Sequence, residues 1–221
     1  MAEARRRRAA LAGPTWIVTR RQTAGIGRRG RAWRDPVGNY AATLVMEVEG
    51  GPPAMALRSF VAALAVHDAA AALAGADGLA LKWPNDVLRH GGKLAGILLE
   101  AMDDRTVAVG IGVNLVAAPD PREVEAGAVP PVSLEGRADV EQFHAALRPA
   151  FEDRERALRT YGFGPTREAW LARAAGLGGP IRARTPREEL RGTFEGIDAA
   201  GHLILRTPRG TVHLPAADIA L

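Results

Sequence analysis

Two lysines stand out because almost every other basic residue of this chain is arginine. The 221-residue sequence has 29 lysines and arginines together, and only Lys82 and Lys93 are lysines. Lysine carries a compact ammonium on a flexible stem, whereas arginine is a wide planar fork. A pocket that must hold one carboxylate or phosphate oxygen at a point favours the ammonium. The two lysines are therefore candidate binding or catalytic residues, with chance proximity as the alternative.

The carboxamide side chains are equally scarce. The chain has three asparagines and two glutamines, and four of these five fall between residues 22 and 114: Gln22, Asn39, Asn85 and Asn114. Each lies beside a glycine, a proline or another unusual residue. This distribution indicates polar positions selected for a site rather than for solubility.

A loop over residues 22–33, QTAGIGRRGRAW, combines three glycines with three arginines. Exposed backbone N–H groups and guanidinium forks can both close on phosphate oxygens. The loop is not a Walker loop, because no Gly-Lys-Ser/Thr follows, and Asp35-Pro36-Val37-Gly38 bars the helix of a Rossmann fingerprint. An arginine-rich surface loop without a ligand is the alternative.

The candidate residues fall on a predicted antiparallel sheet. His90-Gly91-Gly92 is typical of a tight hairpin turn, and Pro84 marks an edge or a bulge. Lys82, Asn85, Asp86 and Lys93 would then crowd one rim of the sheet. Gly110 and Gly112 share a strand face, which indicates close approach by another group, either a flat ligand such as a purine or a helix. The strands expected here are 79–83, 86–89, 93–102 and 106–116.

The remaining elements follow from periodicity and from capping signals. Asp139 is a predicted N-cap of a helix that Pro149 would kink, and its expected apolar face is Val140, Phe143, Leu147, Phe151 and Leu158. Residues 117–138 are expected to be loop. The other expected elements are helices at 2–12, 52–74 and 166–175, strands at 15–21 and 39–49, and a small antiparallel β domain over 181–221.

Composition excludes several classes of protein. The absence of cysteine excludes disulfides, thiolate zinc sites and a cysteine nucleophile, and the five histidines have no metal-ligand spacing. The serines lie in no Gly-x-Ser-x-Gly elbow. A net charge of +4 does not imply strong non-specific nucleic-acid binding. With no apolar run of transmembrane length and no signal peptide expected, the cytoplasm is the predicted location.

Four blocks of the sequence resemble the biotin–protein ligases. Residues 22–33 resemble their glycine/arginine loop, and Lys-Trp-Pro-Asn-Asp at 82–86 with Gly-Lys-Leu-Ala-Gly-Ile-Leu at 92–98 resembles their central block. Residues 110–114 resemble the strand that follows, and 192–205 resemble part of their SH3-like C-terminal domain. The resemblance covers nearly the whole chain, and the central block is highly specific.

The resemblance implies an α+β fold in two parts. Residues 1–176 would form a catalytic domain with a mixed, mainly antiparallel sheet and packed helices, as in class II synthetases, and residues 177–221 a small SH3-like β-barrel. The implied reaction joins biotin to ATP, with Mg²⁺, as biotinyl-5′-adenylate. Biotin is then transferred to a lysine of a biotin carboxyl carrier domain. A homodimer is possible in this family.

Site roles follow from the same resemblance. Lys93 would bridge the biotin carboxylate and the α-phosphate, and Arg28 and Arg31 would hold the phosphoryl group. Asp86 would hold Mg²⁺ or orient Lys93. The residues implied for biotin are Gln22, Gly25, Gly27, Arg28, Trp33, Lys93 and Gly96, and those implied for ATP are Arg28, Arg31, Trp33, Asn85, Asp86, Lys93 and Asn114.

Two departures from the family pattern qualify this interpretation. Ile26 stands where the family usually has arginine, which is expected to weaken adenylate retention. The Ser-Thr-Asn biotin motif is expected just before Ala2, so the first strand is expected to be missing, and no DNA-binding domain is expected. Two alternatives stay open: a lipoate or octanoate ligase, and an impaired module that binds biotin or nucleic acid.

Overall fold

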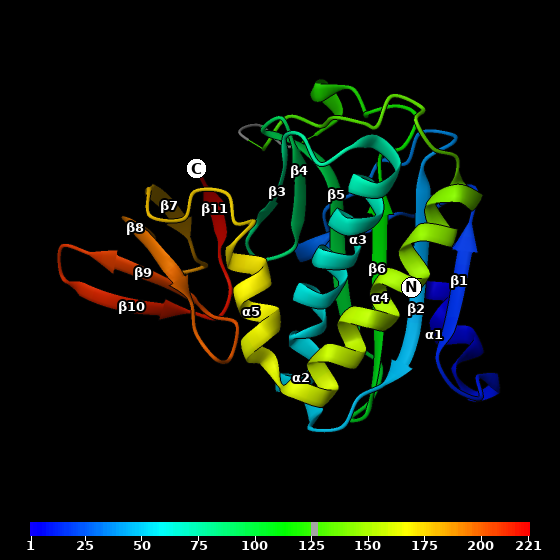
Figure 1. Ribbon diagram of the computed structural model, residues 1–221, viewed down its shortest axis with the longest axis horizontal. Helices are drawn as coiled ribbons and strands as arrows, with labels where there is room; N and C mark the ends of the chain where they lie inside the picture. The colour runs from blue at the N-terminus through cyan, green and yellow to red at the C-terminus, as the bar shows by residue number, and fades with distance from the viewer. Residues whose placement is uncertain (125–127) are drawn as a thin grey trace.

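Two antiparallel sheets organise the chain in the computed structural model, which describes residues 1–124 and 128–221 (Figure 1). The larger sheet has the order β1-β2-β6-β5-β4-β3, and the smaller has the order β10-β9-β8-β7-β11. The strands of the larger sheet are β1 (Thr15–Thr19), β2 (Tyr40–Glu47), β3 (Leu79–Lys82), β4 (Asp86–Arg89), β5 (Gly92–Ala101) and β6 (Thr106–Val113). Those of the smaller are β7 (Pro180–Arg184), β8 (Glu189–Ile197), β9 (Leu203–Thr207), β10 (Gly210–Leu214) and β11 (Asp218–Ala220).

The predicted hairpins are confirmed in both type and position. Strand β4 has the expected bounds, and the turn before β5 is tight because His90 and Gly91 have φ of 47° and 77°. The two sheets lie on either side of the predicted domain boundary after residue 176. This α+β arrangement agrees with the predicted fold class.

Helices cover one face of the larger sheet: α3 packs on β3, β4, β5 and β6, and α4 lies beside α3 and packs against β1 and β2 (Figure 1). Helix α4 begins with the predicted capping box between Asp139 and Gln142, and its predicted apolar face is buried. The helices are α1 (Ala2–Arg7), α2 (Gly51–Ala56), α3 (Arg58–Ala74), α4 (Val140–Tyr161) and α5 (Phe163–Leu171), with 3₁₀ turns η1 (Arg8–Ala10), η2 (Arg28–Gly30) and η3 (Pro121–Glu123).

The bounds of three helices differ from the prediction, and the predicted 166–175 helix ends at Leu171. The N-terminal helix ends at Arg7 and continues as a 3₁₀ turn, and the predicted 52–74 helix is divided at Leu57. Helix α5 begins at Phe163 rather than at residue 166 because proline is tolerated in the first turn of a helix. Part of the predicted 117–138 loop, residues 125–127, lies outside the described residues.

The apolar segment Gly51–Ala74 belongs to the core of the protein. It has the length and mean hydropathy, 1.4, of a membrane-spanning helix, which corrects the expectation that no run reaches that length. However, 61% of its apolar window is buried inside the protein. The apolar side chains therefore form the core between the sheet and α4.

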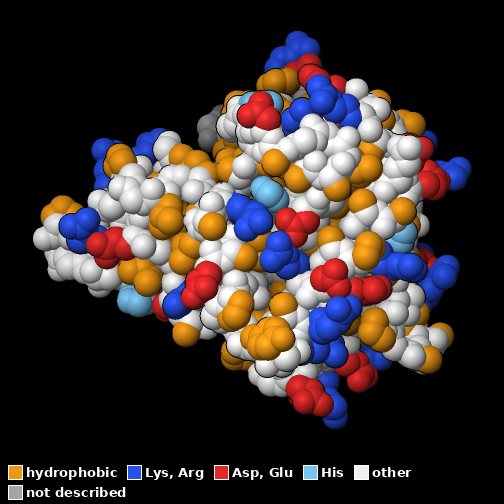
Figure 2. Space-filling view, in the orientation of Figure 1, with side chains coloured by type: hydrophobic (Ala, Val, Ile, Leu, Met, Phe, Trp, Pro, Cys, Tyr) orange, Lys and Arg blue, Asp and Glu red, His pale blue; other side chains and the backbone are white. Residues whose placement is uncertain are grey.

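Charged side chains of both signs are interspersed over the face drawn in Figure 2.

One buried contact joins the smaller sheet to the larger one. The Trp83 side chain, 1% exposed, donates a hydrogen bond from Nε1 to the carbonyl of Gly201, 3.0 Å away. Trp83 lies between β3 and β4, and Gly201 lies in the turn between β8 and β9. The tryptophan of the central block is thus a structural anchor for the C-terminal sheet.

Candidate functional site

A cavity of about 1010 Å³ is lined by every residue that the family resemblance implied for biotin or ATP, whereas Asn39 is buried outside it. Its walls come from the 22–34 loop, the rim of β3, β4 and β5, the end of β6 and the C-terminal sheet. The predicted residues that line it are Gln22, Gly25, Gly27, Arg28, Arg31, Trp33, Asn85, Asp86, Lys93, Gly96 and Asn114. Positions up to 92 residues apart in the chain therefore face one space.

Lys93 is held at the rim from both its backbone and its side chain. Its backbone N–H donates to the carbonyl of Pro130 at 2.7 Å, and its carbonyl accepts from the N–H of Val132 at 3.0 Å. Its Nζ lies 2.7 Å from Asp86 Oδ1. This contact is an ion pair without hydrogen-bond alignment, because Oδ1 accepts no hydrogen bond. The ammonium is therefore positioned, and 29% of its side chain still faces the cavity.

Asp86 stands between the two lysines of the chain. Lys82 pairs with Asp86 across the β3–β4 hairpin, and its Nζ lies 3.9 Å from Asp86 Oδ2. Burial lowers the pKa of Lys82, and the nearby Lys93 charge lowers it further, while Asp86 opposes both effects. One carboxylate thus partly neutralises two ammonium groups, and the pocket remains positive.

Asn85 extends this polar cluster toward the glycine/arginine loop. Its Nδ2 donates to the carbonyl of Ile97 at 2.5 Å, which fixes the orientation of the amide. Its Oδ1 accepts from Arg28 Nη1 at 3.4 Å. Arg28 therefore reaches from the loop to the same rim that holds Lys93.

The loop itself is a small closed hairpin. Gly27 N–H donates to the carbonyl of Arg31 at 2.7 Å, Trp33 N–H donates to the carbonyl of Gly25 at 2.9 Å, and Ile26 forms a β-bridge with Ala32. At its tip, Arg29 has φ of 57°. This geometry turns the backbone so that Arg28 and Arg31 leave the loop on the cavity side.

Trp33 lies on a floor made of two glycines. Gly96 and Gly112 pair across β5 and β6, and a Cβ added to Gly112 would lie 2.6 Å from the Trp33 ring. The Lys93 ammonium lies 5.7 Å from the ring centroid.

The sequence predicted that a flat ligand or a helix approaches Gly110 and Gly112. In the structure the Trp33 indole approaches Gly112 and the Met1 side chain approaches Gly110, so packing on a helix is not what these glycines accommodate.

Gln22 presents an unused acceptor to the cavity. Its Oε1 is buried, yet it has no hydrogen-bond partner among the described residues. A buried carbonyl oxygen without a partner is unfavourable by about 1–3 kcal/mol. The site is therefore suited to a ligand that brings an N–H group to this point.

The side chain of Asn114 is largely engaged within the protein. It is 2% exposed, and its Nδ2 donates to the carbonyl of Val132 at 2.9 Å. Its Oδ1 lies 3.4 Å from Asn39 Nδ2. The amide ties the end of β6 to the segment that also holds the Lys93 backbone, and its predicted contact with adenine stays a prediction.

Asp218, which no sequence pattern indicated, brings the C-terminal sheet into the site. This residue begins β11, lines the cavity and forms ion pairs with Arg28, Arg29 and Arg31 of the loop. The partners are separated by 187 to 190 residues (218 minus 31 and 218 minus 28), and no motif surrounds Asp218. Only the packing of the two sheets brings them together.

The site has limited means of its own to hold a metal ion. Within residues 1–124 and 128–221, no three histidine or acidic side chains are grouped as ligands. Mg²⁺ commonly uses only one or two protein carboxylates together with substrate phosphates. Asp86, with an Oδ1 that accepts no hydrogen bond, fits such a role if the ion arrives with phosphate.

Sequence comparison relates both parts of the chain to known proteins. Residues 2–115 match the model of the biotin/lipoate A/B protein ligase family, and residues 176–221 match that of the biotin protein ligase C-terminal domain. The biotin–[acetyl-CoA-carboxylase] ligase of Paracoccus denitrificans is 54% identical, over 99% of this chain and 95% of its own length. The bifunctional ligase/repressor BirA of Bacillus subtilis is 36% identical over 94% of this chain and 66% of its own length.

Structural comparison agrees at the level of the fold. The biotin protein ligase from Aquifex aeolicus in complex with biotin and ATP superposes with a TM-score of 0.83, at 21% identity, over 95% of this chain and 89% of that one. The Leishmania major enzyme in complex with biotin superposes with a TM-score of 0.65 at 25% identity, over 97% of this chain and 94% of that one.

Proposed function

The chain belongs to the biotin/lipoate A/B protein ligase family, and we propose that the cavity described above carries out the ATP-dependent attachment of biotin to protein. The substrates are biotin, ATP and a lysine of a biotin carboxyl carrier domain. The observation that carries this proposal is the Lys93 ammonium, which is fixed by Asp86 and faced by Arg28 from the loop.

The first step brings two anions together, so charge neutralisation is its main requirement. An oxygen of the biotin carboxylate attacks the α-phosphorus of ATP, a P–O bond forms, and the bond to pyrophosphate breaks. Lys93 would contact both the carboxylate and an α-phosphate oxygen, while Arg28 and Arg31 would hold the phosphoryl group. Their positive charge lowers the repulsion between the reactants.

In the second step, the amine of the acceptor lysine attacks the acyl carbon of the adenylate. A C–N bond forms, AMP leaves with the electrons of the broken C–O bond, and the amine loses a proton. The loop residues Trp33 and Gly25 would cover the adenylate until the acceptor arrives. Gln22 Oε1, which has no hydrogen-bond partner among the described residues, would accept a hydrogen bond from an N–H of the biotin ring system.

A magnesium ion bound with the nucleotide would supply further positive charge to the phosphates. Asp86 would be its protein ligand, sharing its carboxylate with Lys93. Without the ion, the same carboxylate orients the ammonium. In either role, Asp86 would hold a positive charge, from the ion or from the Lys93 ammonium, beside the reacting oxygens.

Three further assignments complete the proposal. We place the protein in the cytoplasm, because the longest apolar segment is taken up by the core. DNA binding is not part of the proposal, since the net charge is only +4. A homodimer would use an open sheet edge. β1 is the candidate, because the outer edge of β3 is already hydrogen-bonded to residues 173–175.

The decisive experiment measures biotin-dependent ATP–pyrophosphate exchange and transfer of labelled biotin to a carrier domain. The wild type should support both, and Lys93→Ala should lose about 10²–10³-fold in exchange rate, as for other groups that stabilise developing charge. Lipoate and octanoate in parallel reactions separate biotin ligation from its alternative in this family. Exchange that prefers octanoate, or full activity of Lys93→Ala, would contradict the proposal.

A further inference from the structure

The carboxylate of Asp218 gathers three guanidinium groups of one loop. Arg31 Nη2 and Arg29 Nη1 lie 2.5 Å and 2.8 Å from Oδ2, and Arg28 Nη1 lies 3.6 Å from Oδ1. Arg28 also lies 3.4 Å from the carbonyl of Ala217. The glycine/arginine loop is therefore attached to the C-terminal sheet at one acidic point.

Charge explains why this contact matters. Three arginines within four residues repel one another when they are held on one side of a hairpin. Burial lowers the pKa of Arg28, and the Arg29 and Arg31 charges add to that effect. Burial also raises the pKa of Asp218, but the hydrogen bond from Arg31 and the three arginine charges outweigh it and bring the net value below the usual range. Asp218 is thus ionised at neutral pH and serves as the counter-charge.

The three contacts are not equivalent. Arg29 and Arg31 share Oδ2 at short distance, whereas Arg28 is held more loosely and also reaches Asn85 at the rim of the pocket. A nucleotide phosphate could therefore engage Arg28 while Arg29 keeps the loop attached. One carboxylate can anchor the loop without occupying the group that is needed for substrate.

We propose that Asp218 is a positioning residue through which the C-terminal sheet holds the glycine/arginine loop closed over the nucleotide site. This inference rests on the proposed function, because it assumes that the loop binds the phosphates of ATP. A loop that is held closed before binding loses less conformational freedom when the nucleotide arrives. Removing the carboxylate should therefore weaken nucleotide binding.

The first test compares Asp218→Asn with the wild type in the full chain. Limited proteolysis with trypsin after Arg28, Arg29 and Arg31 reports on opening of the loop without any need for activity. Partly exposed ion pairs are each worth little, so their joint loss should raise the cleavage rate about three- to tenfold. The KM for ATP should rise by a similar factor. The KM for biotin should rise as well, because the same loop carries Gln22 and Trp33, which the proposed function assigns to biotin.

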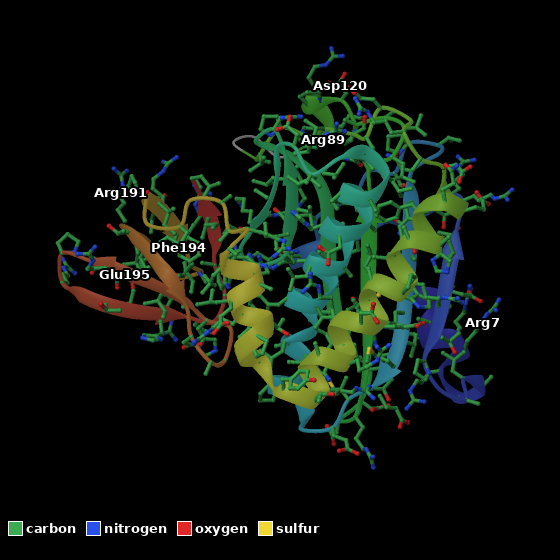
Figure 3. All side chains as sticks on the ribbon, in the orientation of Figure 1. Arg7, Arg89, Asp120, Arg191, Phe194 and Glu195 are labelled. Atoms are coloured by element: carbon green, nitrogen blue, oxygen red, sulfur yellow. The ribbon has the colours of Figure 1, made fainter. Side chains whose placement is uncertain are left out.

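Matched variants separate positioning from general destabilisation. Glu195→Gln removes the same charge from an exposed ion pair with Arg206 in the C-terminal sheet, remote from the loop (Figure 3), and should change neither readout. Asp218→Glu keeps the charge and should restore most of the protection. Unchanged cleavage in Asp218→Asn, or a lower KM for ATP, would overturn the proposal.

Arg29→Ala keeps the proposal decidable even if Asp218→Asn folds poorly, and a double-mutant cycle tests whether the two residues act through one contact. Arg29→Ala removes one anchor, and alone it should raise the cleavage rate after Arg28 and Arg31. In a soluble double variant, the two effects should fall clearly short of additivity, as is typical of residues in direct contact. Additive effects, or an Arg29→Ala variant as resistant as the wild type, would refute it. A wild type that fails to transfer biotin refutes the proposed function instead, since proteolysis does not depend on turnover.

Discussion

At the scale of single residues, the site depends on the small volume of an ammonium. Lys93 Nζ lies 2.7 Å from Asp86 Oδ1 and 5.7 Å from the centre of the Trp33 ring. Its Nζ would also lie 3.5 Å from a Cβ placed on Gly96. The space around the charge is thus bounded on three sides, which explains why arginine, common elsewhere in this chain, does not take its place.

The substitution Lys93→Arg tests this explanation directly. A guanidinium keeps the charge but is planar and wide, so it should displace Trp33 or leave Asp86. We expect biotin-dependent pyrophosphate exchange to fall about 10²-fold, with thermal stability close to that of the wild type. An Arg variant with full exchange activity would show that charge alone is sufficient at this position.

Gly112→Ala tests the floor beneath Trp33. The added methyl group would lie 2.6 Å from the indole, so the ring must move away from β6. We expect a shift in tryptophan fluorescence and a rise in the KM for biotin of about tenfold, as for a displaced positioning group. Gly164→Ala is the matched control, because a Cβ there meets nothing within 4 Å. Equal behaviour of the two variants would contradict the assigned role of the floor.

At the scale of elements, ion pairs fix how α3 and α4 lie on each other. Asp68 of α3 accepts hydrogen bonds from Arg154 of α4 at 2.6 Å and 2.9 Å, and deeper in the interface Arg58 pairs with Glu155. Burial raises the pKa of Asp68, but hydrogen bonds from His67 and Arg154 outweigh it, and the net value is lowered. This pair therefore links helix packing to pH.

The sign of that link follows from the lowered pKa. A carboxyl group with a folded-state pKa below its unfolded value stabilises the protein above the unfolded pKa, and this contribution is lost as the pH falls through the folded pKa. We expect Asp68→Asn to lower the free energy of unfolding at pH 7 by about 1 kcal/mol. Urea titrations should show the difference from the wild type shrinking below about pH 4. A difference that is constant with pH would refute the electrostatic origin.

At the scale of the whole molecule, local patterns predicted the parts better than their assembly. Asp139 and Gln142 make a capping box from residues three apart, and His90-Gly91 turns a hairpin by its own backbone preference. Such signals are contained in a few neighbouring residues. Gathering Lys93, Arg28 and Asn114 in one cavity was predictable only through the family resemblance. Asp218 had no local signal, because its role arises from packing between two sheets.

A hydrogen bond of Trp83 contributes to that packing. Trp83 directly precedes Pro84-Asn85-Asp86 of the site, and its Nε1 donates to the carbonyl of Gly201, whose own position is set against Phe60. Trp83 and Asp218 thus provide two separate attachments between the C-terminal sheet and the rest of the protein. Loss of the Trp83 contact should loosen the joint while leaving each sheet folded.

Trp83→Phe should therefore cost about 1–3 kcal/mol in the free energy of unfolding, because the buried Gly201 carbonyl loses its donor. Trp170→Phe is a matched control: Trp170 is equally buried, but its Nε1 has no partner in the described part of the chain. The difference between the two variants in urea denaturation isolates the hydrogen bond from the loss of ring volume. If Trp83 joins the sheets as described, Trp83→Phe should also raise the KM for ATP and speed tryptic cleavage of the loop. Trp170→Phe should change neither quantity. Equal destabilisation, with the loop protected in both, would mean that the two sheets are held together by other contacts.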